Sequence, residues 1–528
     1  MLDVLTPDEM IQVEKKTFAS GVHSFSVMET AGEAVGQAVA RRFKTKDPVL
    51  VVCGPGNNGG DGFIAARVLS EKGYTVKVVS LVPFGDIKGD ALLAAKSLTE
   101  PMKKEHAVTI DRFTNPEMLR KELDDSAVVV DAIFGIGLDR PVFGDAHLVI
   151  SLIAESKKPV ISVDLPSGIQ GETGDVMGIA LPAVETVTFM HLKPGHLLLP
   201  GRVYSGLVTV VDIHLLPLEE VKSFTPKTWL NRPALWSKYV SVPKLDGHKY
   251  DRGHCIVVSG SASRTGASRL AAMAALRVGA GLVTMASPPD AVMVHAAHMT
   301  TVMIESMEGA TGLEAILEDR HKNVVVIGPA GGIGAAMRGL ILSALATDCA
   351  VVIDADGVTS FAECPEELFH AVQAKRSHGT GFGRGADNCA VITCHEGEFA
   401  RLFPDLSTKN FPGSKVERTR TASMRSGATV VLKGPDTVVA SPDGEVTIAD
   451  NGPPHLATAG TGDVLSGLIG GLLARGAPGF EAASGGVWIQ GETGNKAGPG
   501  LIAEDLPSYV RDVLTELYAG QPLCLSTR

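Results

Sequence analysis

Short apolar runs alternate with helix-patterned segments along most of the chain. In residues 8–44, apolar positions recur at helical spacing, with Met28, Ala31, Val35 and Ala38 on one side. Short apolar runs then follow one another in both halves, as in VLVVC and CAVVID. Runs this short between helical segments are typical of parallel strands buried on both faces. The pattern therefore predicts an α/β architecture throughout, with right-handed crossovers.

The chain is long enough for two such domains. Its 528 residues exceed the size of one ordinary domain. Between residues 215 and 246 the alternation stops, and prolines and mixed charges follow without a sustained period. We therefore predict a first domain over 1–215, a linker over 216–224 and a second domain over 225–520. A short helix is expected around 234–239.

A glycine-rich loop follows the first predicted strand. The strand PVLVVC runs into GPGNNGGDG and then a helix, the order found in dinucleotide-binding units. Three glycines fit G-x-G-x-x-G, but the second strand ends without the acid that binds the ribose in a dehydrogenase. The loop instead carries Asn57, Asn58 and Asp61, whose alternative role is turn formation. We therefore do not expect an ordinary Rossmann dehydrogenase.

Acidic residues end two further strands of the first half. Asp131 closes the run AVVVD, and Asp164 closes KPVISVD shortly before Ser167. The carboxyl ends of parallel strands line one crevice, so these residues should meet the loop 57–61. A single strand-end acid is as often a turn or cap residue. The convergence of three loops therefore carries the hypothesis of a functional site.

A second glycine-rich loop opens a buried helix near the C-terminus. The segment NGPPHLATAGTGDVLSGLIGGLLARG at 451–476 has several glycines directly before an apolar run. The N–H groups at such a helix start, with the positive end of the helix dipole, form an anion site. Asp463 in the first turn is placed to take a proton from a group beside the anion, or only to cap the helix. A cap needs one such residue, whereas Thr458, Thr461 and Asp463 lie here together.

Composition narrows the function classes. Hydrophobic residues at 45% and charged ones at 20% are typical of a globular enzyme, and the net charge of −11 argues against nucleic-acid binding. The sequence shows neither a membrane-spanning run nor the apolar core of a secretory signal. The seven cysteines lack C-x-x-C spacing, and the pair Cys394 and His395 cannot alone fill a tetrahedral metal site. We expect a cytoplasmic enzyme that binds neither nucleic acid nor membranes.

Over residues 1–215, the motifs GPGNNGGDG, DAIFGIG and DLPSG resemble those of the NAD(P)H-hydrate epimerase family. The resemblance implies that Asp131 is the acid/base that inverts the hydrated C6 centre of a damaged nicotinamide ring. It also implies K⁺ as a cofactor, bound by Asn58, Asp131 and Ser167, whose oxygen donors suit a hard cation. The residues that it assigns to substrate binding are Asn57, Asn58, Gly59, Gly60, Asp61, Gly135, Ile136, Gly137, Leu138, Asp139, Arg140, Pro141 and Asp164.

Residues 225–520 resemble the ribokinase-like superfamily and, within it, the NAD(P)H-hydrate dehydratases. The resemblance lies in NG-x-PHLATAGTGDVLSG and in the loops HKYDRGH, GPAGGIG and TCHEGEFARL. It implies that ADP, with Mg²⁺, is the co-substrate and that Asp463 deprotonates the hydroxyl of the hydrated nucleotide. Contacts to that nucleotide are implied for Ala267, Gly332, His395 and Asp463, and contacts to ADP or AMP for Lys433, Gly434, Pro435, Asp436, Thr437 and Gly462.

Two of these residues have an ordinary alternative, and four positions depart from the dehydratase pattern. Lys433 follows a strand, so a solvated lysine is as good an interpretation as a phosphate contact. A single histidine such as His395 is more often a structural residue than a ligand-binding one. The departures are Tyr250 and Ala330 in place of glycines, and Cys394 and Glu396 in place of prolines. The methyl group of Ala330 is expected to leave a ligand less room to approach the loop GPAGGIG.

The two resemblances together predict a bifunctional metabolite-repair enzyme. The first domain would interconvert the R and S epimers of NADHX and NADPHX, and the second would dehydrate the S epimer as ADP becomes AMP. One alternative is a ribokinase-like kinase of hydroxyethylthiazole or a hydroxymethylpyrimidine, which leaves the first half without a role. Another is a first domain that is a silent binding module, against which Asn58, Asp131 and Ser167 speak. Helices with little charge also predict a homo-oligomer.

Overall fold

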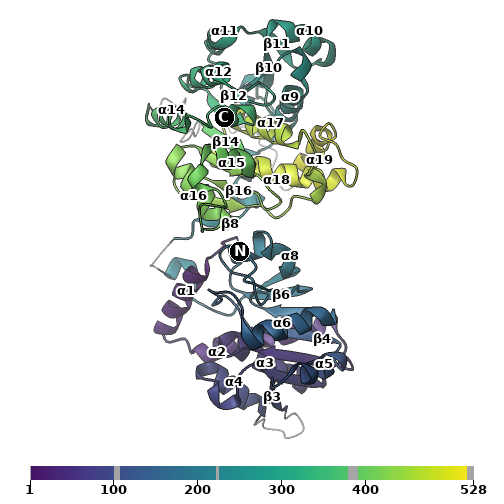
Figure 1. The fold of residues 1–528 in the computed structure, drawn as a ribbon. Coiled ribbons are helices and arrows are strands. Elements are labelled where there is room, and N and C mark those ends of the chain that lie inside the picture. Colours follow the sequence, from purple (N-terminus) through teal and green to yellow (C-terminus); the bar gives the residue numbers. More distant parts are fainter. Residues whose placement is uncertain (1, 100–107, 222–224, 379–389, 520–528) are drawn as a thin grey trace. The chain divides into compact units, whose positions relative to one another are not determined.

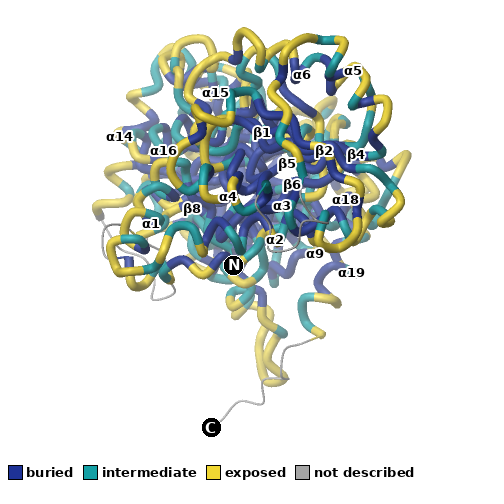
Figure 2. The backbone as a smooth tube through the Cα atoms, turned by 90° about the horizontal axis from the view of Figure 1, so that it is seen from below, coloured by how far each residue is buried: buried dark blue, intermediate teal, exposed yellow. Residues whose placement is uncertain are grey.

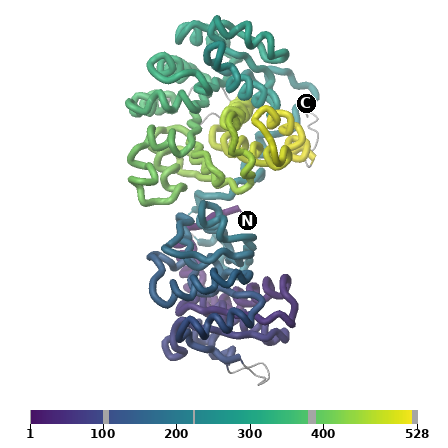
Figure 3. Tube along the Cα trace, turned by 45° about the vertical axis from the view of Figure 1, so that its right-hand side comes forward, coloured from purple at the N-terminus to yellow at the C-terminus, as the bar shows by residue number. Residues whose placement is uncertain are grey.

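The predicted apolar strands assemble into two sheets. The computed structural model describes residues 2–99, 108–221, 225–378 and 390–519. The chain divides into two compact units, residues 1–226 and 227–528. Each sheet takes all its strands from one unit, so the chain colours run from purple to blue in the first and from teal to yellow in the second (Figures 1 and 3). The expected α/β fold class, with a parallel Rossmann-like sheet followed by a second α/β domain, is confirmed.

The first unit contains a parallel sheet of seven strands in the order β3-β2-β1-β4-β5-β6-β7. Its strands are β1 (Val49–Cys53), β2 (Val76–Ser80), β3 (Ile110–Arg112), β4 (Val128–Ala132), β5 (Val160–Val163), β6 (Glu185–Phe189) and β7 (Leu207–Val211). Alternate residues of β1 enter separate cores, with Val49 and Val51 in one and Leu50 and Val52 in the other. A strand buried on both faces explains the continuous apolar run (Figure 2).

Helices supply the two cores of the first unit. They are α1 (Pro7–Ala19), α2 (Ser24–Arg42), α3 (Asn57–Glu71), α4 (Gly89–Thr99), α5 (Pro116–Asp124), α6 (Gly144–Ser156), α7 (Pro194–Leu197) and α8 (Gly201–Ser205). The helical periodicity of residues 8–44 is confirmed, because Met28, Ala31, Val35 and Ala38 lie buried on one side of α2.

The second unit contains ten strands in the order β11-β10-β9-β12-β13-β14-β15-β16-β17-β8. They are β8 (Thr228–Leu230), β9 (His254–Val258), β10 (Leu282–Ser287), β11 (Met303–Ser306), β12 (Val324–Ile327), β13 (Ala350–Asp354), β14 (Ala390–Cys394), β15 (Thr429–Leu432), β16 (Val438–Ala440) and β17 (Val446–Ile448). Among the strand pairs of this sheet in the described residues, only β15–β16 and β16–β17 are antiparallel. The sheet is therefore mostly parallel, as predicted.

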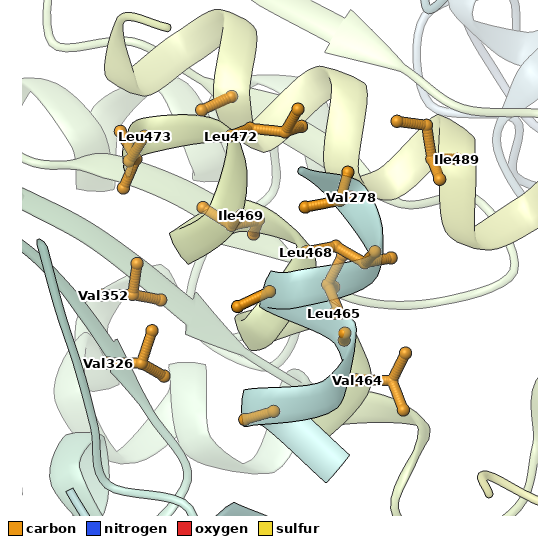
Figure 4. Close-up of a cluster of buried hydrophobic side chains, with 14 of the residues drawn as sticks. Val278, Val326, Val352, Val464, Leu465, Leu468, Ile469, Leu472, Leu473 and Ile489 are labelled. Carbon is orange, nitrogen blue, oxygen red and sulfur yellow. The ribbon is translucent and has the colours of Figure 1, made fainter. Parts of the chain in front are cut away.

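Helix α17 (Thr461–Ala474) lies at the centre of the second core. Figure 4 shows Leu468 and Ile469 of this helix in the apolar cluster that contains Val326 of β12, Val352 of β13 and Val278 of α9. A Cβ atom on Gly467 would lie 2.1 Å from the carbonyl oxygen of Ala271, so α17 and α9 approach closely only because glycine stands there. The helices are α9 (Gly266–Val278), α10 (Pro289–His298), α11 (Gly309–Leu317), α12 (Ala335–Leu345), α13 (Asp356–Thr359), α14 (Pro365–His378), α15 (Glu396–Leu402), α16 (Lys415–Ser426), α17, α18 (Gly479–Ala497) and α19 (Leu506–Tyr518).

The connecting stretch 215–246 is more structured than the sequence predicts. Strand β8 pairs with β17 far along the chain, and Trp236 is buried beside it. A three-residue strand is too short to show a period, so the pattern missed it. The helix expected around 234–239 is present as two 3₁₀ turns, Pro233–Leu235 and Ser237–Tyr239. Residues 222–224 of the predicted linker lie outside the described residues.

Candidate functional site

The first predicted site lies where the strand order of the first sheet reverses. Strand β1 pairs with β2 on one side and β4 on the other, so the loops that leave β1 and β4 diverge at the carboxyl edge. Such a switch point is where open α/β sheets bind ligands. A Cβ atom on Gly54 would lie 2.0 Å from the carbonyl oxygen of Ile133, and one on Gly59 2.1 Å from that of Gly54. The two loops therefore touch through glycine.

The amino end of α3 begins at this switch point with an amide-rich turn. Gly56 caps the helix without a side-chain hydrogen bond, which leaves the N–H groups of the first turn for an anion. The Nδ2 group of Asn58 is buried and has no hydrogen-bond partner among the described residues. Its Oδ1 atom would lie 2.9 Å from a Cβ atom on Gly135, so the loops 57–61 and 135–141 meet there.

Asp131, at the end of β4, is fully buried and held by four hydrogen bonds. Its Oδ1 accepts from the Ser167 hydroxyl (2.5 Å) and the Ile133 N–H (3.3 Å). Its Oδ2 accepts from the Ser167 N–H (2.8 Å) and the Ser162 hydroxyl (3.0 Å). Burial raises the pKa of the Asp131 carboxyl above its ordinary value, and these hydrogen bonds offset only part of that effect.

Asp164 lies at the same carboxyl edge of the sheet but is held as an ion pair. Its Oδ1 accepts hydrogen bonds from Lys193 Nζ (2.7 Å) and the Thr188 hydroxyl (3.0 Å), and its Oδ2 accepts from the Ile136 N–H (3.2 Å). Burial acts to raise the pKa of Asp164, but the charge and hydrogen bond of Lys193 hold it below its usual value. Lys193 is 1% exposed, so this pair is a buried salt bridge.

Asp164 has a strained backbone and lies close to other acidic side chains. Asp164 has φ 63°, and His196 Nε2 bonds its carbonyl oxygen at 2.8 Å. Burial and then Lys193 lower the pKa of His196 to about 4, so the ring is neutral; its Nδ1 accepts from the Lys193 N–H, and Nε2 therefore carries the proton. Burial, Asp164 and Glu14 together raise the pKa of Asp61 well above its ordinary value.

The second predicted site lies at the carboxyl edge of the second sheet. A Cβ atom on Gly260 would lie 2.2 Å from the carbonyl oxygen of Ala330, and one on Gly328 1.9 Å from that of Asp354. The loops that follow β9, β12 and β13 are therefore packed against one another. Ala330 itself adopts φ 49°, the left-handed conformation that glycine favours, which accounts for the expected glycine at this position.

Asp463 stands in the first turn of α17, after Gly460 in the left-handed conformation. No group of the described residues donates a hydrogen bond to its carboxylate. Burial and then the nearby charge of Asp354 raise the pKa of Asp463 to about 6, although Lys433 acts in the opposite direction. A carboxylate with this pKa beside a helix amino terminus is suited to accept a proton near neutral pH.

Lys433 lies beside the same helix end. Its Nζ donates to Asp354 Oδ1 at 2.7 Å and lies 3.8 Å from Glu398 Oε2, and a Cβ atom on Gly462 would be 3.6 Å from it. The Ser466 hydroxyl of α17 donates to the other oxygen of Asp354 (2.6 Å). Burial acts to lower the pKa of Lys433, but Asp354 and Glu398 raise it. Lys433 is therefore protonated and lies beside the position that an anion bound to the start of α17 would occupy.

A cleft of about 250 Å³ opens next to Lys433. Four of the residues expected to bind the adenine nucleotide, together with Gly462, line it: Lys433, Gly434, Pro435 and Thr437. Asp436 is the exception, because it is buried and pairs with Lys415 at 2.6 Å. Apolar walls from Leu456, Leu465 and Val487 complete a surface suited to a flat aromatic base.

The remaining expected residues of the second unit differ in placement. Gly332 donates its N–H to Asp356 Oδ2 (2.9 Å), and half-buried Ala267 lies in the first turn of α9. His395 caps α15, accepts at Nδ1 from the Gly397 N–H (2.9 Å), and stays exposed. Cys394 points into the core, so the pair of Cys394 and His395 does not act together. The described residues contain no cluster of three or more His, Cys, Asp or Glu residues that could hold a metal ion.

One motif does not join the site. HKYDRGH precedes β9 and thus lies at the amino edge of the sheet, whereas the loops above lie at the carboxyl edge. Tyr250 is exposed there and packs against His321 with ring centroids 5.0 Å apart.

Residues that were not predicted from the sequence also shape both sites: Lys193, Thr188, His196 and Ser162 in the first unit, and Asp354 and Ser466 in the second. Asp354 ends an apolar strand as Asp131 does, so the same signal could have found it.

Comparisons with known proteins agree with this division. A family model described as NAD(P)H-hydrate dehydratase matches residues 255–515, and one described as YjeF-related protein N-terminus matches residues 24–195. The chain is 34% identical to the bifunctional NAD(P)H-hydrate repair enzyme Nnr of Thermofilum pendens, over 94% of this chain and 93% of that protein. It is 32% identical to that of Moorella thermoacetica, over 97% of each. A ribokinase-like superfamily structure from Enterococcus faecalis covers 57% of this chain and 99% of its own, with 21% identity and a TM-score of 0.47.

No helix among the described residues is long and apolar enough to cross a membrane.

Proposed function

The chain belongs to the family of bifunctional NAD(P)H-hydrate repair enzymes, and we propose that its two units carry out the two steps of that repair. The first unit interconverts the R and S epimers of NADHX and NADPHX. The second dehydrates the S epimer to NADH or NADPH while ADP becomes AMP and phosphate. What supports this assignment is the likeness over nearly the whole chain, together with a carboxylate at the carboxyl edge of each sheet, Asp131 in the first unit and Asp463 in the second.

In the first unit, the substrate pyrophosphate binds the N–H groups at the start of α3, and the loop 135–141 covers the nucleotide. The substrate contacts on one side are Asn57, Asn58, Gly59, Gly60 and Asp61, and Asp164 holds the covering loop through the Ile136 N–H. Asp131 acts as the acid/base at C6. Its raised pKa suits proton exchange, and Ser167, which holds both of its oxygens, connects it to Phe134 of the loop after β4.

The residues expected to bind K⁺ have suitable chemistry. Asn58, Asp131 and Ser167 supply a carboxamide, a carboxylate and a hydroxyl oxygen, and all three converge on the segment 133–135. Oxygen donors of this kind suit a hard monovalent cation. K⁺ bound there would balance the buried negative charge of Asp131 and fix the loop beside the substrate.

In the second unit, ADP lies in the cleft beside Lys433, with its phosphates between that lysine and the N–H groups that open α17. Asp463 takes the proton from the ring hydroxyl, whose oxygen attacks the terminal phosphorus of ADP, and AMP leaves. The phosphorylated hydroxyl then departs as phosphate with loss of a ring proton, which restores the double bond of the reduced nicotinamide. Mg²⁺ usually binds substrate phosphates and one or two carboxylates, so no larger acidic cluster is needed. Ala267, Gly332 and His395 complete the hydrated-nucleotide side.

Two further predictions belong to this proposal. The chain forms a homo-oligomer, for which exposed apolar side chains such as Met293 and Ile333 are available contacts. Its cytoplasmic location stays a prediction from the sequence.

One assay tests the function. The protein is incubated with chemically hydrated NADH, with ADP, with ATP and without nucleotide, and the near-ultraviolet absorbance of reduced nicotinamide is followed. We expect complete recovery of both epimers with a nucleotide and none without it. A stable phosphorylated product would favour a small-molecule kinase, and no recovery with either nucleotide would contradict the proposal.

A further inference from the structure

A basic cavity lies at the amino edge of the second sheet, opposite the edge that carries the nucleotide cleft. Its volume is about 480 Å³, which is within the usual range of small-molecule sites. The HKYDRGH segment, the residues before it and the end of α17 form its walls. The lining residues are Tyr239, Ser241, Val242, Pro243, Lys244, Gly247, His248, Lys249, Asp251, Arg252 and Arg475.

The cavity concentrates positive charge on an acidic protein. Lys244, Lys249, Arg252 and Arg475 line it, and Asp251 is the only carboxylate among its lining residues. The chain as a whole has a net charge of −11. A concave cationic surface on such a background focuses the field on anions.

Two of the cations, Arg252 and Arg475, lie next to each other. A Cβ atom on Gly279 would lie 2.6 Å from Arg475 Nη1 and 3.3 Å from Arg252 Nη2. In the described part of the chain, no ion pair joins either guanidinium to an acid. Burial and then the charge of Arg475 lower the pKa of Arg252, which indicates that the two groups repel each other. An anion between them would relieve that repulsion.

The end of α9 accounts for part of this arrangement. Arg252 Nε donates to the carbonyl oxygen of Gly279 (2.9 Å), and Arg475 Nη1 donates to that of Val278 (3.0 Å). Arg475 Nη2 also donates to the carbonyl oxygen of Ser241 (2.6 Å), and its Nη1 donates to the Tyr518 hydroxyl (3.1 Å). These contacts fix both guanidiniums at the cavity wall, but they use only some of their N–H groups. Both η nitrogens of Arg252 keep donors for a ligand.

We propose that this cavity binds a small phosphate-bearing anion, separately from the two repair sites. The paired guanidiniums supply planar, fixed donors that match phosphate oxygens. Lys244 and Lys249, both exposed and both lining the cavity, supply further positive charges for a second phosphate group. An anion with two phosphate groups should therefore bind more tightly than inorganic phosphate.

The test uses inorganic pyrophosphate and calorimetry on the full chain. The nucleotide cleft and the start of α3 also attract phosphates, so binding is measured in a Lys433→Gln background and the cavity is read from the change that the lysine substitutions cause. We expect a binding event that the double substitution Lys244→Gln and Lys249→Gln weakens about tenfold, since each charged contact to phosphate is strong. Both lysines are exposed, so the fold should be kept. Lys238→Gln, a nearby lysine that does not line the cavity, should leave affinity unchanged.

Inorganic phosphate and a change of salt complete the design. Phosphate should bind more weakly than pyrophosphate, and added salt should weaken both. The proposal would be overturned if the two lysine substitutions left pyrophosphate affinity unchanged. It would also be overturned if Lys433→Gln alone abolished all pyrophosphate binding. Neither outcome depends on the repair activity.

Discussion

The two proposed catalytic carboxylates occupy opposite environments. Asp131 is fully buried and accepts four hydrogen bonds, two of them from Ser167. Asp463 stands in the first turn of α17, half-buried and without a hydrogen-bond donor among the described residues. Burial raises the pKa of both groups, but only Asp463 is free to reorient toward a ligand. The first unit therefore fixes its acid in a network, whereas the second leaves its acid poised at a helix terminus.

The two environments predict different contributions of Asp131 and Asp463 to the stability of the fold. Replacing Asp131 should disturb the fold of its loops as well as any chemistry, because its donors lose their acceptor. Replacing Asp463 should disturb chemistry alone. The predictions below test this contrast, beginning with the largest effect.

Asp463→Asn should reduce the dehydration rate about a thousandfold, because loss of a general base typically costs this much. The measurement is the rate of NADH recovery from the S epimer with ADP. The thermal unfolding midpoint at neutral pH should not fall, since the carboxylate accepts no hydrogen bond from any described residue and burial disfavours its ionised form. Asp405→Asn, at an exposed acid paired with Arg425, serves as the matched control. A dehydration rate in Asp463→Asn equal to that of the unmodified protein would contradict the proposed role of Asp463 as the base.

Lys193→Met should destabilise the first unit by about 3–5 kcal/mol, because it leaves Asp164 buried without its partner. Calorimetric unfolding of the full chain measures this change. The three tryptophans, Trp229, Trp236 and Trp488, all lie in the second unit, so their fluorescence transition should not move.

The double variant Lys193→Met with Asp164→Asn is the control for that substitution. It removes the unpaired charge and should recover part of the stability. An equal loss in the single and double variants would show that the charge pair is not the cause.

The pH dependence of dehydration should sharpen the contrast. The pKa of Asp463 is raised to about 6, and the base must be ionised to act. The single-turnover rate should therefore rise with pH up to about 6 and then level off, falling about tenfold per unit below that value. Asp354→Asn should move this limb to lower pH, because it removes a negative neighbour. A limb near the ordinary value of 3.8 would contradict the assigned environment.

Ala330→Gly should have the smallest effect, a stabilisation of the second unit by about 0.5–1 kcal/mol. Ala330 adopts φ 49°, which costs a residue with a Cβ atom more than glycine. Asp164 in the first unit has the same kind of backbone but is held by its side chain. Ala344→Gly, inside α12, should have the opposite sign because glycine weakens a helix interior. Destabilisation by Ala330→Gly would contradict this explanation.

Much of the fold follows from local pattern. Parallel strands buried on both faces give continuous apolar runs, so the sheets and the loops at their carboxyl ends could be predicted. Strand β8 could not, because its pairing with β17 depends on contacts far along the chain. The same limit hid Lys193, whose role depends on its burial against Asp164.

The candidate sites were predictable only in part. Lys433 and Gly462 do line one cleft, since a strand end and a helix start carry clear signals. Asp436 lies in the expected loop, but its pairing with Lys415 could not be read from spacing. The position of HKYDRGH at the opposite edge follows from its place before a strand rather than after one.

The most direct test follows both epimers of hydrated NADH in the same reaction, separated by chromatography. With Asp131→Asn and ADP, the account predicts that the S epimer is consumed and the R epimer persists beyond its spontaneous conversion. Adding the Asp463→Asn variant, which retains the first unit, should then consume the R epimer as well. Consumption of both epimers by Asp131→Asn alone, at the rate of the unmodified protein, would contradict the claim that two separate sites act in turn.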